Sequence, residues 1–201
     1  MDAIKLGVVI PTMGTSHLID TLASLPPGCA LYLRDNRVEN WGVAKSWNWG
    51  IQQAVVDGCT HILVSNDDVE FDPLIIPALI AAFDHDPRIL MTTAYNTRDG
   101  EQRGEDQYDH PDFSLFMIPQ RFLDVMGPFD EKFWPAYFED NDMHQRMKQG
   151  NWRTLTPHSA PMYHWGSRTI RELAPMKAMN DHFFEKNKAY FRQKWGFVPG
   201  E

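Results

Sequence analysis

The first half of the chain alternates between continuous apolar runs and segments in which apolar residues recur three or four positions apart. Continuous runs of this length predict buried strands, whereas the spaced pattern predicts amphipathic helices. The expected strands lie at 5–12, 29–36, 61–65 and 88–96, and the expected helices lie at 17–25, 43–55 and 73–83. Because the strands are apolar throughout, the pattern indicates an α/β fold with a mostly parallel central sheet and helices on both faces.

The second half has a less regular pattern. Residues 97–110 are polar, punctuated by glycine and without apolar periodicity, which predicts a long loop that is either functional or mobile. The other expected elements are a strand at 113–119, helices near 120–126 and 139–149, a strand region near 153–164 and an amphipathic helix at 176–195. No internal repeat interrupts this order, so we expect a single domain over residues 1–201.

Composition and charge narrow the possible partners. The chain carries 27 acidic and 19 basic residues, a formal net charge of -8, which argues against nucleic acid as a partner. No apolar run approaches the ~18 residues of a membrane span, and the N-terminus lacks the layout of a signal peptide. Cys29 and Cys59 each open an apolar run, which predicts buried, reduced thiols. These features predict a cytoplasmic protein without a transmembrane segment, and they give no indication of its oligomeric state.

Polar residues follow three of the predicted strands at the point where each strand ends. They are Thr12 in the first case, Asp35 and Asn36 in the second, and Asn66, Asp67 and Asp68 in the third. The carboxyl ends of parallel strands meet at one edge of a sheet, where open α/β sheets bind their ligands. Two interpretations of Asn66, Asp67 and Asp68 stay open. Asn and Asp are favoured in helix caps and Asx-turns, and their oxygens are also ligands for a hard divalent cation.

Three acidic residues, Glu139, Asp140 and Asp142, open a predicted helix directly after the aromatic run "FWPAYF". One interpretation is that their charges complement the helix dipole, with Asp142 and Arg146 forming a surface pair four residues apart. The other is that Glu139 or Asp140 faces a partly apolar cleft and acts as a general base. His164 stands at a predicted strand end, where it is either a structural residue or a metal ligand.

The order of these motifs adds information that none of them gives alone. The chain carries, in sequence, "VVIPT", "LRDN", "NWGVAKSWNWGIQQA", "NDDV", "MGPFDEKFWPAYFEDNDMHQRMKQG", "YHWGS" and "YFRQKWG". In order and spacing these segments resemble family-2 glycosyltransferases of the GT-A fold, over about residues 7–196. The most specific parts are the "GPFDE" to "EDND" block and the pattern of Asn40, Gly42, Asn48 and Gly50. The resemblance implies a nucleotide-sugar-binding half at about 1–96 and an acceptor-binding, catalytic half at about 97–201.

The resemblance also implies how the donor is bound. Pro11 and Thr12 would lie against the nucleobase of a nucleoside-diphosphate sugar, with UDP as the expected nucleotide, and Asp35 would hydrogen-bond that base. The other expected donor-binding residues are Asn36, Asn40, Asn66 and Asp67. The short "RVEN" that follows "DN" departs from the family pattern, which leaves the identity of the base open.

A metal site is the next implication. Asn66, Asp67 and Asp68 match the DxD element of the family, in which Asp68 is the ligand of a divalent cation, Mn²⁺ or Mg²⁺. His164 matches a later residue that completes the metal or diphosphate site. Asn66 stands where the family usually has aspartate and so removes one charge from the surroundings of the metal, from which we expect a modest metal affinity.

The implied reaction is inverting transfer of a sugar to a glycan, a glycoconjugate or another hydroxyl acceptor. Asp140 matches the catalytic base, and Glu139 would orient the acceptor. An oxocarbenium-like transition state needs acidic groups on both sides of the sugar, and Asp68 and Asp140 suit these roles. Trp134 and Trp165 flank the predicted site, where they could stack on a sugar ring or simply pack. Two alternatives stay open: a catalytically silent domain that binds nucleotide sugars or glycans, and a sugar-phosphate nucleotidyltransferase.

Overall fold

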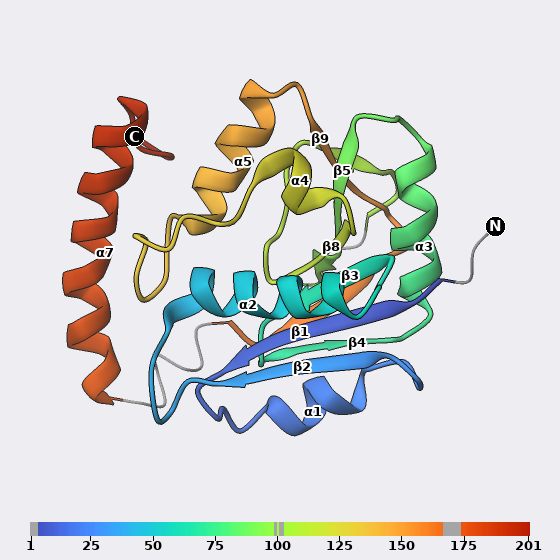
Figure 1. Ribbon diagram of the computed structural model, residues 1–201, viewed down its shortest axis with the longest axis horizontal. Coiled ribbons are helices and arrows are strands. Elements are labelled where there is room, and N and C mark those ends of the chain that lie inside the picture. The colour runs from blue at the N-terminus through green and yellow to red at the C-terminus, as the bar shows by residue number, and fades with distance from the viewer. Residues whose placement is uncertain (1–3, 99, 101–102, 167–173) are drawn as a thin grey trace.

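The computed structural model describes residues 4–98, 100, 103–166 and 174–201 (Figure 1). Its strands are β1 (Leu6–Thr12), β2 (Ala30–Asp35), β3 (His61–Ser65), β4 (Val69–Phe71), β5 (Ile89–Thr93), β6 (Tyr95–Asn96), β7 (Gln107–Tyr108), β8 (Leu115–Pro119), β9 (Arg153–Thr156) and β10 (Pro161–His164). Its helices are α1 (Leu18–Ala23), α2 (Gly42–Val56), α3 (Ile75–Ala81), the 3-10 helix η1 (Ala82–Asp84), α4 (Phe122–Met126), α5 (Glu139–Gln149) and α7 (Ala174–Trp195). None of the helices within these described ranges has both the length and the apolar character of a membrane span. Of the predicted 97–110 loop, residues 99, 101 and 102 lie outside the described residues.

A seven-stranded sheet with the order β2-β1-β3-β8-β5-β9-β7 forms the centre of the fold. β1 pairs in parallel with β2 and β3, and β5 pairs in parallel with β9. β8 is antiparallel to both β3 and β5, and β7 is antiparallel to β9. The strands β2, β1, β3, β5 and β9 therefore share one direction, which confirms the mostly parallel sheet. The insertion of β8 between β3 and β5 joins the two halves of the chain in one sheet.

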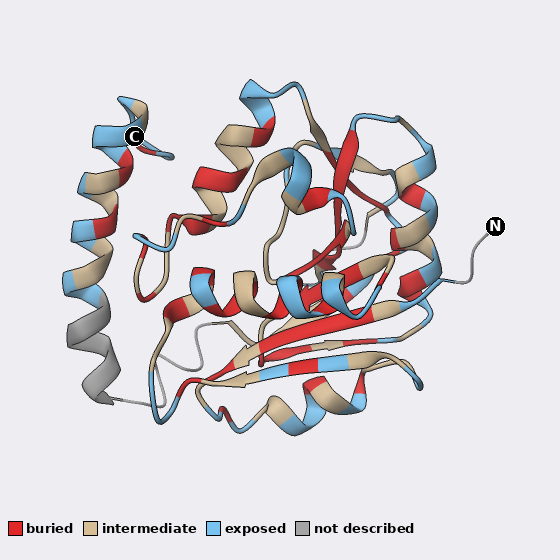
Figure 2. Cartoon of the chain, in the orientation of Figure 1, coloured by how far each residue is buried: buried red, intermediate tan, exposed pale blue. Residues whose placement is uncertain are grey.

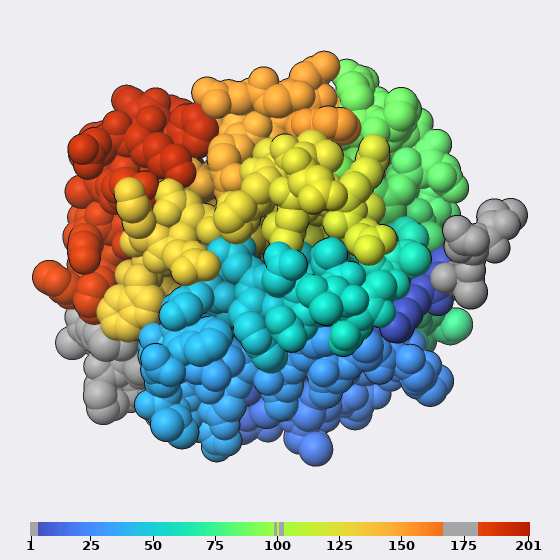
Figure 3. Space-filling model, in the orientation of Figure 1, coloured from blue at the N-terminus to red at the C-terminus, as the bar shows by residue number. Residues whose placement is uncertain are grey.

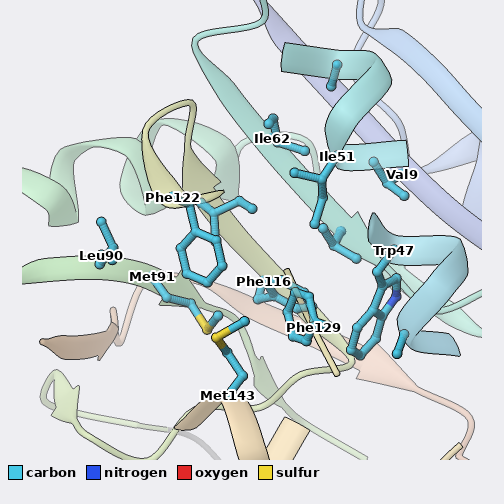
Figure 4. Packing of buried hydrophobic residues seen from close by; sticks show 14 of the residues in the cluster. Val9, Trp47, Ile51, Ile62, Leu90, Met91, Phe116, Phe122, Phe129 and Met143 are labelled. Carbon is cyan, nitrogen blue, oxygen red and sulfur yellow. The ribbon is translucent and has the colours of Figure 1, made fainter. Parts of the chain in front are cut away.

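Helices cover both faces of this sheet, so its central strands are buried on both sides (Figures 1 and 2). Neighbouring residues of β1 illustrate the arrangement. Val9 belongs to a cluster on the α2 face that includes Trp47 and Ile51 (Figure 4), whereas Val8 belongs to a cluster on the opposite face that includes Leu63. Buried apolar side chains on both faces hold the strand ends in fixed positions, because close-packed interiors adapt little.

A second, three-stranded sheet with the order β4-β10-β6 connects the late part of the chain to the end of β3. β4 begins directly after Asp68, and β10 runs antiparallel to it with His164 opposite Val69. The backbone N–H of Trp165 donates to the carbonyl oxygen of Asp68 at 3.0 Å. Residues far apart in the sequence, Asp68 and His164, are adjacent for this reason.

Two predicted strand regions divide between the two sheets. Residues 88–96 form β5 in the central sheet and β6 in the small one, and residues 153–164 form β9 and β10. In the second region Pro157 and Pro161 bracket a turn, in which the N–H of Ala160 donates to the carbonyl of Pro157 at 3.1 Å. β9 therefore ends at Thr156, before this turn, and β10 begins after it at Pro161.

The glycine and asparagine pattern of α2 has an architectural role. A Cβ on Gly50 would lie 2.3 Å from Cγ1 of Val9, so glycine alone allows this helix to approach β1 so closely. The Asn48 side chain donates to the carbonyl of Phe129 at 2.9 Å and accepts from its N–H at 2.8 Å. These bonds fix the "GPFDE" turn on α2, and Figure 3 shows this part of the chain, in yellow, lying against the blue and cyan surface of α2.

Candidate active site

A cleft with a volume of about 550 Å³ opens at the carboxyl ends of β1, β2 and β3, and this size suits a small-molecule site. Its described lining residues are Pro11, Thr12, Met13, Asn36, Asn40, Gly42, Val43, Trp47, Asn66, Asp67, Asp68, Pro111, Asp112, Phe113, Ser114, Pro135, Ala136, Tyr137, Glu139, Asp140 and His164. Every predicted donor-binding, metal-binding and catalytic residue except Asp35 belongs to this set. The three polar strand ends and the acidic start of α5 therefore face one cleft.

Asp67 ties the ends of β1 and β3 together. Its Oδ2 accepts hydrogen bonds from the Thr12 hydroxyl at 2.5 Å and from the N–H of Met13 at 3.3 Å, and its carbonyl accepts from the Thr15 hydroxyl at 2.9 Å. Burial raises the pKa of the Asp67 carboxyl, and the bond from Thr12 opposes this rise. The contacts of Asp67 are therefore architectural, and its part in donor binding stays a prediction.

Asp68 and His164 form a pair at the edge of the cleft. Nε2 of His164 lies 3.1 Å from Oδ1 of Asp68, and their side chains are only 18% and 6% exposed. Nδ1 of His164 lies 3.0 Å from the Ser114 hydroxyl, which orients the ring and turns Nε2 toward Asp68. A carboxylate oxygen and an imidazole nitrogen at this spacing fit the divalent cation that the family resemblance implies. Since imidazole is an uncommon ligand for Mg²⁺, the donor set suits Mn²⁺ better.

A second group of potential metal ligands lies beside this pair. The ligand atoms of His17, Asp20 and Glu70 all lie within 4.8 Å of one another. However, Glu70 accepts a hydrogen bond from Nε1 of Trp165 at 2.6 Å, and the His17 ring stacks on Trp165 with 4.1 Å between the ring centroids. These contacts hold Trp165, and His17, Asp20 and Glu70 are not among the described residues that line the cleft.

Asn36 and Asn40 line the cleft and also shape the start of α2. The side-chain amide of Asn36 donates to the hydroxyl of Ser46 at 3.0 Å. Oδ1 of Asn40 accepts from the N–H of Gly42, the first residue of α2, at 2.9 Å. Both side chains retain polar atoms near the cleft, and their contact with a donor stays a prediction.

Asp35 lies outside the lining residues, although it pairs in register with Thr12. Its carboxylate accepts hydrogen bonds from the Arg37 side chain, including one of 2.5 Å from Nη2 to Oδ2. These bonds lower the pKa of Asp35 to about 2. The role of Asp35 in base recognition stays a prediction.

Glu139 and Asp140 stand in the first turn of α5, and both line the cleft. Glu139 is 5% exposed, and within the described part of the chain its Oε2 has no hydrogen-bond partner. Burial, and then the charge of Asp140, raise the pKa of Glu139 well above its usual range. Burial also raises the pKa of Asp140, with a smaller contribution from Asp112, while the N–H of Asn141, 2.7 Å from Oδ1, opposes the rise. A carboxylate with a raised pKa is a better proton acceptor near neutral pH.

The Asp142–Arg146 pair is present, but it is not the surface pair that the spacing predicts. The side chain of Asp142 is fully buried, and its Oδ2 lies 3.1 Å from Nε of Arg146. Its Oδ1 accepts from Nε1 of Trp195 at 2.9 Å and lies 2.7 Å from Nζ of Lys194. The C-terminal "KWG" segment therefore contributes a donor and a cation to a buried carboxylate, which explains its place in the motif pattern.

Comparison with known proteins identifies the family. The model of the family described as "Glycosyl transferase family 2" matches residues 11–170, well over half of the chain. The chain belongs to this family. No curated protein sequence matches the chain.

Solved structures resemble this family 2 glycosyltransferase in fold. A197 from STIV has a TM-score of 0.58 and 18% identity, with 81% of this chain and 86% of that chain covered. The structure of GalNAc-T7 with UDP, GalNAc and Mn²⁺ has a TM-score of 0.62 and 13% identity. Here 81% of this chain is covered, and it spans 44% of the GalNAc-T7 chain. At these identities the likeness shows the fold, which is GT-A.

The aromatic residues in the cleft of this glycosyltransferase are not those that the sequence singles out. Trp134 and Trp165 are absent from the described lining residues, and Trp134 instead donates from Nε1 to the carbonyl of Asn40 at 3.1 Å. Trp47, Phe113 and Tyr137 line the cleft in their place. Sequence reasoning also missed Ser114, which orients His164, because no local signal marks a serine at the start of β8.

Replacing Glu139 with glutamine should stabilise the protein at pH 8 by about 1 kcal/mol, because burial makes ionisation of this carboxyl costly. The raised pKa means that the folded chain binds this proton more tightly than the unfolded chain does. Stability should therefore fall as the pH rises from the unfolded pKa of about 4.3 through the folded pKa. The glutamine variant does not undergo this loss of stability. The difference in free energy of unfolding between the variant and the wild type, measured by urea denaturation, should therefore grow between pH 5 and pH 8. Glu105→Gln, at an exposed position, is the matched control. If E139Q were no more stable than the wild type at pH 8, the prediction would be contradicted.

Proposed function

We propose that the chain is a metal-dependent, inverting glycosyltransferase that moves a sugar from a nucleoside-diphosphate sugar to an acceptor hydroxyl. Membership of glycosyl transferase family 2 and the GT-A fold support a nucleotide-sugar glycosyltransferase in general. The observation that carries the finer proposal is that one cleft contains both a carboxylate–imidazole pair, Asp68 with His164, and two buried carboxyls, Glu139 and Asp140. Inverting transfer needs charge neutralisation at the leaving group and a base at the acceptor.

The chain's own residues have distinct parts in this reaction. Asp68 and His164 would hold the cation, and a bound Mn²⁺ or Mg²⁺ would stabilise negative charge on the diphosphate. Asp140 accepts the proton of the acceptor hydroxyl as its oxygen forms a bond to the anomeric carbon. The bond from that carbon to the diphosphate breaks, and its electron pair leaves with the nucleoside diphosphate. Glu139 orients the acceptor beside Asp140.

The proposed donor is a UDP-sugar and the proposed acceptor is a neutral glycan or glycoconjugate. The UDP, GalNAc and Mn²⁺ in the GalNAc-T7 structure support the choice of nucleotide and of cation. The described lining residues include Asp112, Glu139 and Asp140 but neither lysine nor arginine, so an anionic acceptor would meet like charge in this part of the cleft. A cytoplasmic location stays a prediction.

The proposal is tested by incubating the protein with a panel of UDP-, GDP- and dTDP-sugars and Mn²⁺ while released nucleoside diphosphate is measured. We expect release from UDP-sugars, its loss with a chelator, and its acceleration by a neutral glycan acceptor. NMR of the product should then show the opposite anomeric configuration to the donor. Retention of configuration would overturn the inverting mechanism, and release unaffected by chelator would overturn the metal requirement.

The two alternatives give different results in the same experiment. A silent binding domain would bind a nucleotide sugar, as calorimetry would detect, but would release no diphosphate even slowly. A nucleotidyltransferase would release pyrophosphate from a nucleoside triphosphate and a sugar phosphate. Family membership favours the glycosyltransferase over both.

A further inference from the structure

Asn187 of α7 makes an unusual set of contacts with the chain just before the candidate base. It is 1% exposed, and its side-chain amide donates to three carbonyl oxygens of one loop, residues 134–138. The acceptors are the carbonyls of Trp134 at 3.2 Å, Ala136 at 2.9 Å and Tyr137 at 3.3 Å. The two N–H bonds of one buried amide are thus shared among three backbone acceptors of the 134–138 loop.

Aromatic contacts reinforce this attachment. Phe184, on the same helix as Asn187, packs against Tyr137 and Phe138 with centroid distances of 5.3 Å and 5.2 Å. Phe191 also packs against Phe138, at 5.6 Å. The red helix α7 therefore lies along the yellow segment that contains the 134–138 loop, as Figure 3 shows.

The opposite side of the 134–138 loop is attached to α2. The carbonyl of Pro135 accepts from the N–H of Val43 at 2.8 Å, so it points to α2, whereas the carbonyls on either side of it point to Asn187. The contact is close, because a Cβ on Gly42 would lie 2.8 Å from the Pro135 oxygen. The 134–138 loop is held between two helices that belong to different parts of the sequence.

The backbone of the 134–138 loop also needs this support. Tyr137 and Phe138 both have a left-handed backbone conformation, with φ of 77° and 75°, which is unfavourable for bulky residues. Residues 135–137 line the cleft, and Glu139 and Asp140 follow immediately at the start of α5. The position of the Asp140 carboxylate therefore depends on a strained backbone that the surrounding contacts must maintain.

We propose that Asn187 is a positioning residue, which fixes the 134–138 loop and thereby places Asp140 against the acceptor hydroxyl. This inference rests on the proposed glycosyltransferase function. The donor side of the cleft is built by the ends of β1, β2 and β3, and none of the described lining residues belongs to α7. Loss of the Asn187 amide should accordingly affect the catalytic step and acceptor use, and leave donor binding unchanged.

The test compares Asn187→Leu, which has a similar size but no donor, and Asn187→Ser, which keeps one donor, with the wild type. Gln193→Leu is the matched control, because it removes an amide from an exposed position on the same helix.

Each protein is assayed with a UDP-sugar, Mn²⁺ and a neutral glycan at a temperature below its unfolding transition. Displacement of a reacting group by about 1 Å can cost about 10²-fold in rate, so we expect kcat to fall 10- to 100-fold in N187L and less in N187S. The dissociation constant for the UDP-sugar should change less than about twofold.

The outcomes separate this proposal from the proposed function. Wild-type kcat in folded N187L would overturn the positioning role while leaving the glycosyltransferase function intact. A loss of activity that only follows the loss of folded protein, or failure of both variants to fold, would show that Asn187 serves folding and would also overturn the role. If the wild type releases no diphosphate from any donor, the proposed function fails first and the positioning role fails with it.

Discussion

Replacing Asp140 with asparagine should lower kcat by about 10²- to 10⁴-fold, the usual contribution of a general base. The amide has nearly the same shape as the carboxylate, and its Oδ1 can still accept the N–H of Asn141, so the start of α5 should be unchanged. The change removes the proton acceptor alone. Steady-state kinetics with saturating UDP-sugar and Mn²⁺ would measure the loss, and the dissociation constant for the donor should stay within about twofold of the wild-type value.

The pH dependence of the wild type gives an independent check on the base. Burial raises the pKa of Asp140, so kcat/KM should begin to fall on acidification above the ordinary aspartate range near pH 3.9. Asp112→Asn removes a like charge that raises the same pKa, so it should move this acid limb to lower pH. Asp124→Asn, at an exposed position on α4, should leave both kcat and the profile unchanged. Wild-type turnover by D140N would mean that another group accepts the proton.

The order of the strands in the first half was predictable because each one is a continuous apolar run with a short polar end. Val8, Val9 and Ile10 are buried without exception, and the local pattern carries that information. The insertion of β8 and the pairing of β10 with β4 were not predictable in the same way. Both depend on contacts between residues far apart in the sequence, for which periodicity gives no signal.

The residues of the candidate site differ in the same way: some could be predicted from local sequence patterns, and others could not. Thr12, Asn36 and Asp67 follow strands, so topology alone predicts that they share one edge of the sheet. His164 was placed beside Asp68 only through resemblance to a family, since nothing local relates the two residues. Asn187 gave no signal at all, because an asparagine in an amphipathic helix does not reveal that it faces three carbonyls of a distant loop.

Asp142 shows how burial changes the meaning of a sequence pattern. An acidic residue four positions before an arginine predicts an exposed pair worth a few tenths of a kcal/mol. The carboxylate is instead fully buried and contacts Arg146, Lys194 and Trp195. Removing the carboxylate from this buried cluster is strongly destabilising, since Arg146 and Lys194 lose the partner that they share and keep only their other bonds.

Asp142→Ala should therefore lower the free energy of unfolding by about 3–5 kcal/mol, as measured by urea denaturation at neutral pH. Trp195→Phe removes the Nε1–H donor and part of the ring, and should cost about 1–3 kcal/mol, because the hydrogen bond it loses has a charged acceptor. The effects of the two changes should not add in the double variant, because both act on the same carboxylate. Asp124→Ala, at an exposed aspartate of α4, should change stability by no more than about 0.5 kcal/mol. If D142A lost no more stability than D124A, the carboxylate would not be needed to hold the C-terminal helix. The aromatic contacts of Phe191 and its neighbours would then hold the helix without it.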